Sequence, residues 1–299
     1  MGTLPSSGAG VALVFEGGGM RASYSSGVLN ALLEGEVHLD WVGGISAGAS
    51  CTVNYLARDQ WRTQHSFTDF AGEPNFGGLG TWVRGKGMFH AEWIYEQTSG
   101  PDEVLPLDFD AFAANRAQCA IGAVRCTDGE MVYWGREDLR TRTDLMKRVR
   151  ASSTMPLLMP WTEIDGVPYC DGALGPTGGF AVDAARDAGH EKLLVVMTRT
   201  RGYRKGVLRS PRAMRALLRR FPAVAQGIID RPANYNRTLE ELFELERQGK
   251  AYLVFPDEMP IGNGERNLGK LRAMYQRGLT QGRRELDAIR EFAGLPAGA

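Results

Sequence analysis

The feature that most constrains this chain is a serine between two glycines in the stretch WVGGISAGASCTVNYLA, residues 41–57. The apolar residues before Gly44 predict a strand, and the small and apolar residues after Ser46 predict a helix. Gly44 and Gly48 carry no Cβ, so the backbone can turn sharply and pass close to its neighbours. We therefore expect Ser46 at a strained strand-to-helix turn with its hydroxyl presented at the sheet edge, as nucleophilic acyl transfer requires.

The serine motif alone has two interpretations. A chain with 38 glycines readily contains Gly-x-Ser-x-Gly by chance, and an ordinary turn after a buried strand would look the same. Under the catalytic interpretation, the N–H of Ala47 points in the same direction as the hydroxyl of Ser46, near the positive end of a helix. Such an N–H group stabilises the oxyanion of an acyl-transfer reaction.

A second glycine motif, EGGGMR at residues 16–21, follows a short apolar strand predicted over residues 11–15. A helix is predicted over residues 22–33 by its apolar periodicity. Three glycines between a strand and a helix indicate a loop whose N–H groups face outward and bind anions. A dinucleotide fingerprint is one interpretation, but the next strand ends in the serine turn instead of an acidic residue. We therefore favour an oxyanion hole.

The remaining pattern predicts an α/β order, in which strand–helix–strand units imply parallel strands. Turns at Asp128-Gly129 and Asp165-Gly166 indicate two hairpins. The aromatic-rich residues 60–106 indicate a lid or acyl-binding wall, an insertion packed into the core, or both. Helices are further expected over residues 138–152, 181–188, 238–248 and 268–292, and strands over residues 118–127, 130–134, 164–169, 193–198 and 251–255.

Composition excludes several classes of protein. Lys+Arg and Asp+Glu both number 35, so we expect no nucleic-acid partner. The apolar runs are too short to cross a bilayer, and residues 1–10 are interpreted as a loose leader without the features of a signal peptide. The cysteines form no CxxC pair and have apolar neighbours, so we expect buried free thiols, no metal site and a cytoplasmic location. They are Cys51, Cys119, Cys126 and Cys170.

The stretch over residues 199–229 contains nine basic residues and no acidic one. Within it, Arg212, Arg215 and Arg219 share one face of a predicted amphipathic helix. That face has two interpretations. It contacts an anionic membrane as a peripheral surface, or the acidic residues over 240–246 neutralise it within the fold.

A serine nucleophile needs a base, and the candidates are Asp171 and the histidines. None of the four histidines, His38, His65, His90 and His190, has a recognisable base context in the sequence, although a triad histidine need not be local. Asp171 follows the end of an apolar strand and precedes Gly172, which allows backbone to approach closely. Asp171 is therefore the better candidate.

In combination these motifs resemble the patatin-like phospholipase family. The resemblance is carried by EGGGMR, GISAG and DGA, and by ASSTMP and VPYCDGA before the aspartate, and it covers residues 11–200. It implies a Ser-Asp dyad, in which Ser46 attacks an ester carbonyl and Asp171 accepts the proton and later activates water. No metal or cofactor is required. Residue 22 is alanine where the family often has glycine.

The resemblance also implies roles for the residues around the dyad. The oxyanion hole would be formed by N–H groups of the glycine loop and the serine turn, namely Gly17, Gly18, Gly19, Met20 and Ala47. The motif-supporting residues are Arg21, Gly44, Gly48, Gly172 and Ala173. Arg21 either braces the loop or lies near a substrate phosphate.

We therefore expect an α/β three-layer sandwich with a largely parallel central sheet. A catalytic domain is expected over residues 11–198, followed by a helical extension over 199–299 that packs on it or stands apart. The expected function is lipid acyl-ester hydrolysis of the phospholipase A or lysophospholipase type. Two alternatives stay open: a soluble carboxylesterase or thioesterase with the same dyad, and a non-catalytic lipid-binding regulator. The expected partners are a lipid or other acyl ester and an anionic membrane.

Overall fold

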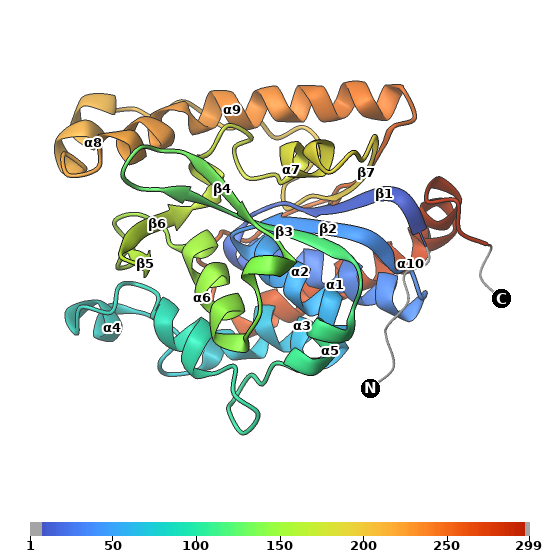
Figure 1. Cartoon of the computed structure of the whole chain (residues 1–299), viewed down its shortest axis with the longest axis horizontal. Helices are drawn as coiled ribbons and strands as arrows, with labels where there is room; N and C mark the ends of the chain where they lie inside the picture. The colour runs from blue at the N-terminus through green and yellow to red at the C-terminus, as the bar shows by residue number, and fades with distance from the viewer. Residues whose placement is uncertain (1–7, 297–299) are drawn as a thin grey trace.

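The computed structural model of the chain describes residues 8–296 and places a mixed sheet between two layers of helices (Figure 1). The strand order is β5-β6-β3-β2-β1-β7-β8, and β4 also pairs with β3. Pairings among β1, β2, β3, β7 and β8 are parallel, whereas β4 and β6 pair antiparallel with β3, and β5 pairs antiparallel with β6. The strands are β1 Gly8–Phe15, β2 Leu39–Ile45, β3 Gln118–Arg125, β4 Met131–Trp134, β5 Thr162–Ile164, β6 Val167–Asp171, β7 Lys192–Val196 and β8 Ala251–Val254.

The expected α/β sandwich with a largely parallel sheet is thus confirmed. The strand expected over residues 11–15 begins earlier, at Gly8, and residues 1–7 of the expected leader lie outside the described part of the chain. The α-helices are α1 Ala22–Glu34, α2 Ala47–Ala57, α3 Gln60–Phe67, α4 Leu79–Val83, α5 Phe109–Ala114, α6 Arg142–Ser153, α7 Val182–Asp187, α8 Pro211–Leu217, α9 Pro222–Arg247 and α10 Leu268–Phe292.

The central strand β1 shows how the sheet is covered on both sides. Leu13 and Phe15 pack into the core shared with α1, α2, α6 and α10, whereas Ala12 and Val14 pack into the core shared with α7 and α9. Successive side chains of a strand point to opposite faces, so a strand buried on both faces is apolar throughout. Figure 1 shows α7 and α9 on one side of the sheet and the larger group of helices on the other.

The C-terminal part of the chain completes this same core. Strand β8 pairs with β7 and extends the central sheet, and α10 packs along α1. The two helices meet at glycines, because a Cβ on Gly27 would lie 2.1 Å from the carbonyl oxygen of Tyr275, and one on Gly278 would lie 2.0 Å from that of Tyr24. Residues 199–296 therefore contribute the strand expected over 251–255 and the helix expected over 268–292 to this core.

The basic and acidic segments are arranged differently from the sequence expectation. The basic helix α8 is short and ends at Leu217, because Pro222 begins a new helix. The acidic helix expected over residues 238–248 is the second half of the long helix α9, which continues through Pro232. An internal proline normally bends or ends a helix, but α9 continues through this one.

Three smaller expectations concern the cysteines, membrane spans and metals. All four cysteines are buried free thiols, as predicted. Within residues 8–296, no helix combines the length and apolar character needed to cross a bilayer. In the same part of the chain, no group of three or more His, Cys, Asp or Glu side chains is arranged to hold a metal ion.

Candidate active site

Ser46 occupies the sharp turn that connects β2 to α2. Its backbone angles are φ 58° and ψ −126°, a conformation that residues other than glycine rarely adopt. The flanking glycines are required sterically, because a Cβ on Gly44 would lie 2.1 Å from the carbonyl oxygen of Gly48, and one on Gly48 would lie 2.2 Å from that of Phe15. The structure therefore has the strained strand-to-helix turn that the motif predicts.

A serine outside the motif holds this turn in place. The N–H of Ser46 donates a hydrogen bond to Oγ of Ser152 at 2.9 Å, and the hydroxyl of Ser152 donates to the carbonyl oxygen of Gly122 at 2.6 Å. Helix α6 and strand β3 are thereby linked to the turn. Sequence reasoning noted the segment around Ser152 but assigned the residue no role, because a bracing contact between distant segments leaves no local pattern.

Asp171 lies at the end of β6, and its side chain meets that of Ser46. The sheet register explains the meeting: Ile45 pairs with Gly122, and the next residue of β3, Ala123, pairs with Asp171. The Ser46 hydroxyl lies close enough to the Asp171 carboxylate to help lower its pKa. Oδ1 of Asp171 accepts a hydrogen bond from the N–H of Ala173 at 2.9 Å.

The environment of Asp171 makes its carboxyl a stronger base than a solvent-exposed one. Burial raises the pKa of Asp171, and this effect is opposed by the charge of Arg231, by the hydrogen bond from Ala173, by the hydroxyl of Ser46 and by the charge of Lys205. Gly172 is required next to it, because a Cβ there would lie 2.4 Å from the carbonyl oxygen of Gly122. A buried carboxyl in contact with a hydroxyl is suited to proton transfer.

The glycine loop lies beside Ser46, but not all of its N–H groups are free. The N–H of Gly17 donates to the carbonyl oxygen of Gly179 at 3.1 Å, and that of Met20 donates to the carbonyl oxygen of Asn263 at 2.9 Å. Those two groups are therefore already occupied by the protein. The N–H groups of Gly18, Gly19 and Ala47 have no acceptor among the described residues, so they are free to donate to a bound group.

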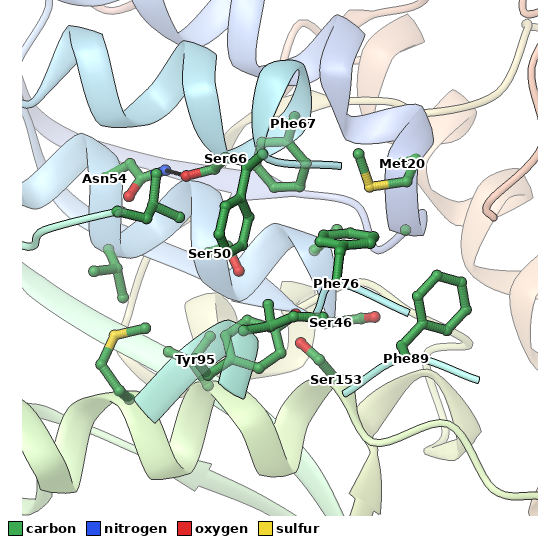
Figure 2. Close-up of a pocket in the computed structure, with 18 of the residues that line it drawn as sticks. Met20, Ser46, Ser50, Asn54, Ser66, Phe67, Phe76, Phe89, Tyr95 and Ser153 are labelled. Atoms are coloured by element: carbon green, nitrogen blue, oxygen red, sulfur yellow. Dashed lines mark hydrogen bonds between the residues drawn. The ribbon is translucent and has the colours of Figure 1, made fainter. Parts of the chain in front are cut away.

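An apolar pocket opens beside Ser46 (Figure 2). Gly19 and Ala47 line it at the end near the serine, and aromatic and aliphatic side chains line the rest, including Phe67, Phe70, Phe76, Phe89, Ile94 and Met159. Several of these aromatics come from the segment over residues 60–106. Phe67, Phe70 and Phe76 are buried, so this segment forms the pocket wall and part of the core at once.

The pocket contains two polar features that sequence reasoning missed. Burial raises the pKa of Tyr95, which lines the pocket together with Ser50, Ser153 and Ser46. The fully covered guanidinium of Arg62 donates to Oδ1 of Asn54 at 3.1 Å and to backbone carbonyls of the 105–106 segment, and burial lowers its pKa to about 10. Neither residue belongs to a recognisable motif.

The histidines do not take part in this arrangement. His38 directly precedes β2, at the opposite end of the strand from Ser46, and His190 precedes the parallel strand β7 and packs against Trp41. His65 stacks on Trp61 and bonds its carbonyl oxygen. In the described part of the chain, no histidine hydrogen-bonds the side chain of Ser46 or of Asp171, and Asp171 accepts from the N–H of Ala173.

The motifs and the fold agree with the comparison with known proteins. The model of the family described as patatin-like phospholipase matches residues 13–181. The chain belongs to the patatin-like phospholipase family. A second model, described as a domain of unknown function (DUF6363), matches residues 221–294. That second match covers α9, β8 and α10, which share the core of the patatin-like part.

Two further similarities were found, one in sequence and one in fold. The chain is 26% identical over 190 residues to the uncharacterized protein YjjU of Escherichia coli strain K12. That match covers 63% of the chain and 52% of YjjU, so the similarity spans about half the length of this relative. The crystal structure of VipD from Legionella pneumophila is similar in fold, with a TM-score of 0.50, 12% identity, and coverage of 96% of this chain and 68% of VipD.

Proposed function

We propose that the protein hydrolyses lipid acyl esters, with Ser46 as the nucleophile and Asp171 as the base. The observation that carries the proposal is the approach of these two side chains to each other at a strained turn beside an apolar pocket. Family membership supports the reaction class. The pocket supports a long acyl chain, because its phenylalanine side chains give an apolar chain a favourable environment.

The proposed reaction has two steps. In the first, Oγ of Ser46 attacks the ester carbonyl carbon, Asp171 takes the hydroxyl proton and passes it to the departing alcohol, and an acyl-enzyme forms. In the second, Asp171 takes a proton from water, the hydroxide oxygen attacks the acyl carbon, and Ser46 recovers its proton as the fatty acid leaves. The N–H groups of Gly18, Gly19 and Ala47 stabilise the oxyanion in both steps, each contributing about 3 kcal/mol.

The surface near the pocket favours a substrate held in a membrane. Exposed apolar side chains from α4, the 157–158 segment and α8 line a common groove, namely Trp82, Leu157, Leu158 and Leu217. Met159 lines both this groove and the acyl pocket, so the groove leads toward Ser46. Figure 1 shows α4 and α8 at the same end of the molecule. We propose that this end contacts lipid.

The basic residues of α8 support an anionic surface as the partner. Arg201 and Arg204 are neutralised by Glu246 and Glu240, as the packing interpretation expects. In contrast, the arginines closest to the groove form no ion pair within residues 8–296: Arg209, Arg212, Arg215, Arg219 and Arg220. Neutralisation by acidic residues thus accounts for Arg201 and Arg204, and contact with an anionic membrane is proposed for the unpaired arginines.

Labelling with a fluorophosphonate probe, combined with hydrolysis assays, tests the proposed function. We expect the wild-type protein to be labelled at Ser46 and to release fatty acid from phospholipid vesicles. Turnover of short p-nitrophenyl esters without turnover of phospholipid would favour the soluble esterase alternative. Absence of both labelling and turnover in folded protein would favour the non-catalytic regulator.

A further inference from the structure

Four basic side chains gather on the α9 side of the sheet without an ion pair in the described part of the chain: Arg21, Arg199, Lys205 and Arg231. They come from three regions, because Arg21 follows the glycine loop, Arg199 and Lys205 follow β7, and Arg231 lies in α9. Strands β1 and β7 are parallel neighbours, so the residues that follow them meet at one edge of the sheet. The turn after β2 that carries Ser46 lies at that same edge.

Two tyrosines organise the group. The guanidinium of Arg199 lies over the ring of Tyr203 at 4.3 Å, and the ring of Tyr203 lies 6.0 Å from that of Tyr235. Nζ of Lys205 lies 4.6 Å from the centre of the Tyr235 ring. The backbone of Lys205 is fixed to α9, since its N–H and its carbonyl oxygen both hydrogen-bond the side chain of Asn236, at 2.9 and 3.0 Å.

The acidic groups nearby are already engaged. Glu16 is 2% exposed and accepts hydrogen bonds from the Tyr235 hydroxyl at 3.0 Å and from the N–H of Thr198 at 2.5 Å. The other nearby carboxyl is Asp171, which accepts a hydrogen bond from the N–H of Ala173 and lies beside the hydroxyl of Ser46. Two carboxyl groups with other partners thus face four basic groups, and the group as a whole has excess positive charge.

The basic side chains also have donors without acceptors. Nε of Arg21, of Arg199 and of Arg231 is buried and has no hydrogen-bond partner, and Arg21 is only 6% exposed. Buried donors without acceptors are costly, and buried charges are normally paired. Burial, together with repulsion from Arg231, Arg21 and Arg199, lowers the pKa of Lys205 to about 8, although the charge of Glu16 acts in the opposite direction. A bound anion would relieve both costs.

We propose that Arg21, Arg199, Lys205 and Arg231 form a binding site for a phosphate group beside the dyad. Guanidinium groups bind phosphate oxygens in pairs, and a lysine adds a point charge, so this set of donors matches a phosphate. Arg231 and Lys205 lie close enough to Asp171 to lower its pKa. A phosphate bound by them would therefore lie near the reacting ester. This inference rests on the proposed function: among lipid esters, the site selects those whose head group carries a phosphate.

The binding site is tested without turnover. In full-length Ser46→Ala protein, calorimetric titration with inorganic phosphate at low ionic strength measures the site directly. We expect Arg199→Gln with Arg231→Gln to weaken phosphate binding at least tenfold. The matched control is Arg201→Gln with Arg204→Gln, two arginines of the same region that are already paired with Glu246 and Glu240, and it should bind phosphate as Ser46→Ala does.

The single variant Lys205→Gln tests the site if the double variant does not fold. We expect it to weaken phosphate binding at least threefold while its circular dichroism spectrum stays unchanged. Lack of phosphate binding by folded Ser46→Ala protein, or equal binding by all variants, would overturn the site. This titration needs no catalysis, so it decides the site even if no ester is hydrolysed and the proposed function fails.

A second assay distinguishes a lipid head group from free phosphate. With Ser46 intact, kcat/KM is measured for a phospholipid and for a diacylglycerol with the same acyl chains, both in neutral detergent micelles. We expect the phospholipid to be preferred, and the ratio to fall at least tenfold in the Arg199→Gln, Arg231→Gln variant. An unchanged ratio in a variant that no longer binds phosphate would overturn the head-group assignment and leave a free anion as the ligand.

Discussion

The hydroxyl of Ser46 lies beside the carboxylate of Asp171 and helps to lower its pKa, although one residue lies in the second strand-to-helix connection and the other at the end of a late hairpin. Strand β3 brings them together, because it pairs with β2 on one side and with β6 on the other. The contact therefore depends on the sheet register, and a slip of β6 by one residue would turn the carboxylate to the opposite face.

The first prediction concerns the dyad. We expect Ser46→Ala and Asp171→Asn each to reduce kcat/KM for an ester by at least about 1,000-fold, because each removes one half of a proton-transfer pair. The double variant should be little worse than either single variant, since residues that act as a unit are not additive. Steady-state kinetics with a chromogenic ester, on variants with unchanged circular dichroism, provide the measurement.

The histidines serve as the control for this prediction. Replacing each of His38, His65, His90 and His190 with Gln should change kcat/KM by less than about tenfold, far below the loss for a missing triad base. A histidine variant as inactive as Asp171→Asn would show that a triad operates in place of the dyad.

The second prediction is a pH dependence. Asp171 must be ionised to accept the proton, and burial raises its pKa above the ordinary aspartate value, so kcat/KM should rise with pH through that raised pKa. The positive charge of Arg231 lowers the pKa of Asp171 and so keeps its carboxyl ionised to lower pH. Arg231→Gln should therefore move the acidic limb of the profile to higher pH.

The profile of Arg231→Gln is measured with an uncharged soluble ester in phosphate-free buffer, so that binding of a head group does not contribute. Arg247→Gln is the matched control, because Arg247 lies at the exposed end of the same helix and pairs with Glu244. Superimposable limbs for the wild type and Arg231→Gln would show that Arg231 does not influence the base.

Local patterns predicted much of the fold and the centre of the site. The turn at Ser46 and the glycine loop were recognisable because their backbone geometry requires glycine at fixed spacings, and α10 has the bounds that its periodicity predicts. The sequence prediction also included the N–H groups of Gly17 and Met20 among the oxyanion donors. Only the tertiary structure reveals that Gly179 and Asn263 occupy the N–H groups of Gly17 and Met20.

The surroundings of Asp171 were beyond the reach of sequence reasoning. Arg231 lies in α9 before the helix expected over residues 238–248, and its effect on Asp171 depends on how α9 packs across the sheet. The same holds for Ser152, whose contact with Ser46 joins two distant segments. Long-range packing of this kind has no spacing rule, so a single sequence contains no signal for it.

The third prediction uses the strained backbone of Ser46. Both Ser46→Gly and Ser46→Ala lack the nucleophile, but glycine adopts a φ of 58° without strain and alanine does not. We expect Ser46→Gly to be more stable than Ser46→Ala by about 1 kcal/mol in the free energy of unfolding, measured by urea denaturation. At an unstrained position glycine is the less stable of the two, so a reversed order would contradict the strain.

The last prediction concerns contact with membranes. The arginines near the groove lack acidic partners, and a basic residue close to an anionic bilayer contributes about 1 kcal/mol. We expect the combined change of Arg212, Arg215 and Arg219 to Gln to weaken sedimentation with anionic vesicles by at least tenfold in the partition coefficient at low salt. The difference should shrink as salt is added, because screening shortens the range of the attraction.

The matched control changes Arg201 and Arg204 to Gln, which removes basic residues of the same segment that Glu246 and Glu240 already neutralise. That variant should sediment as the wild type does. Trp82→Ser tests the apolar part of the same surface, since Trp82 is 56% exposed beside the groove, and its loss should weaken binding equally at low and high salt. If the triple arginine variant binds anionic vesicles as tightly as the wild type at low salt, α8 has a structural role only, and the groove alone must account for lipid contact.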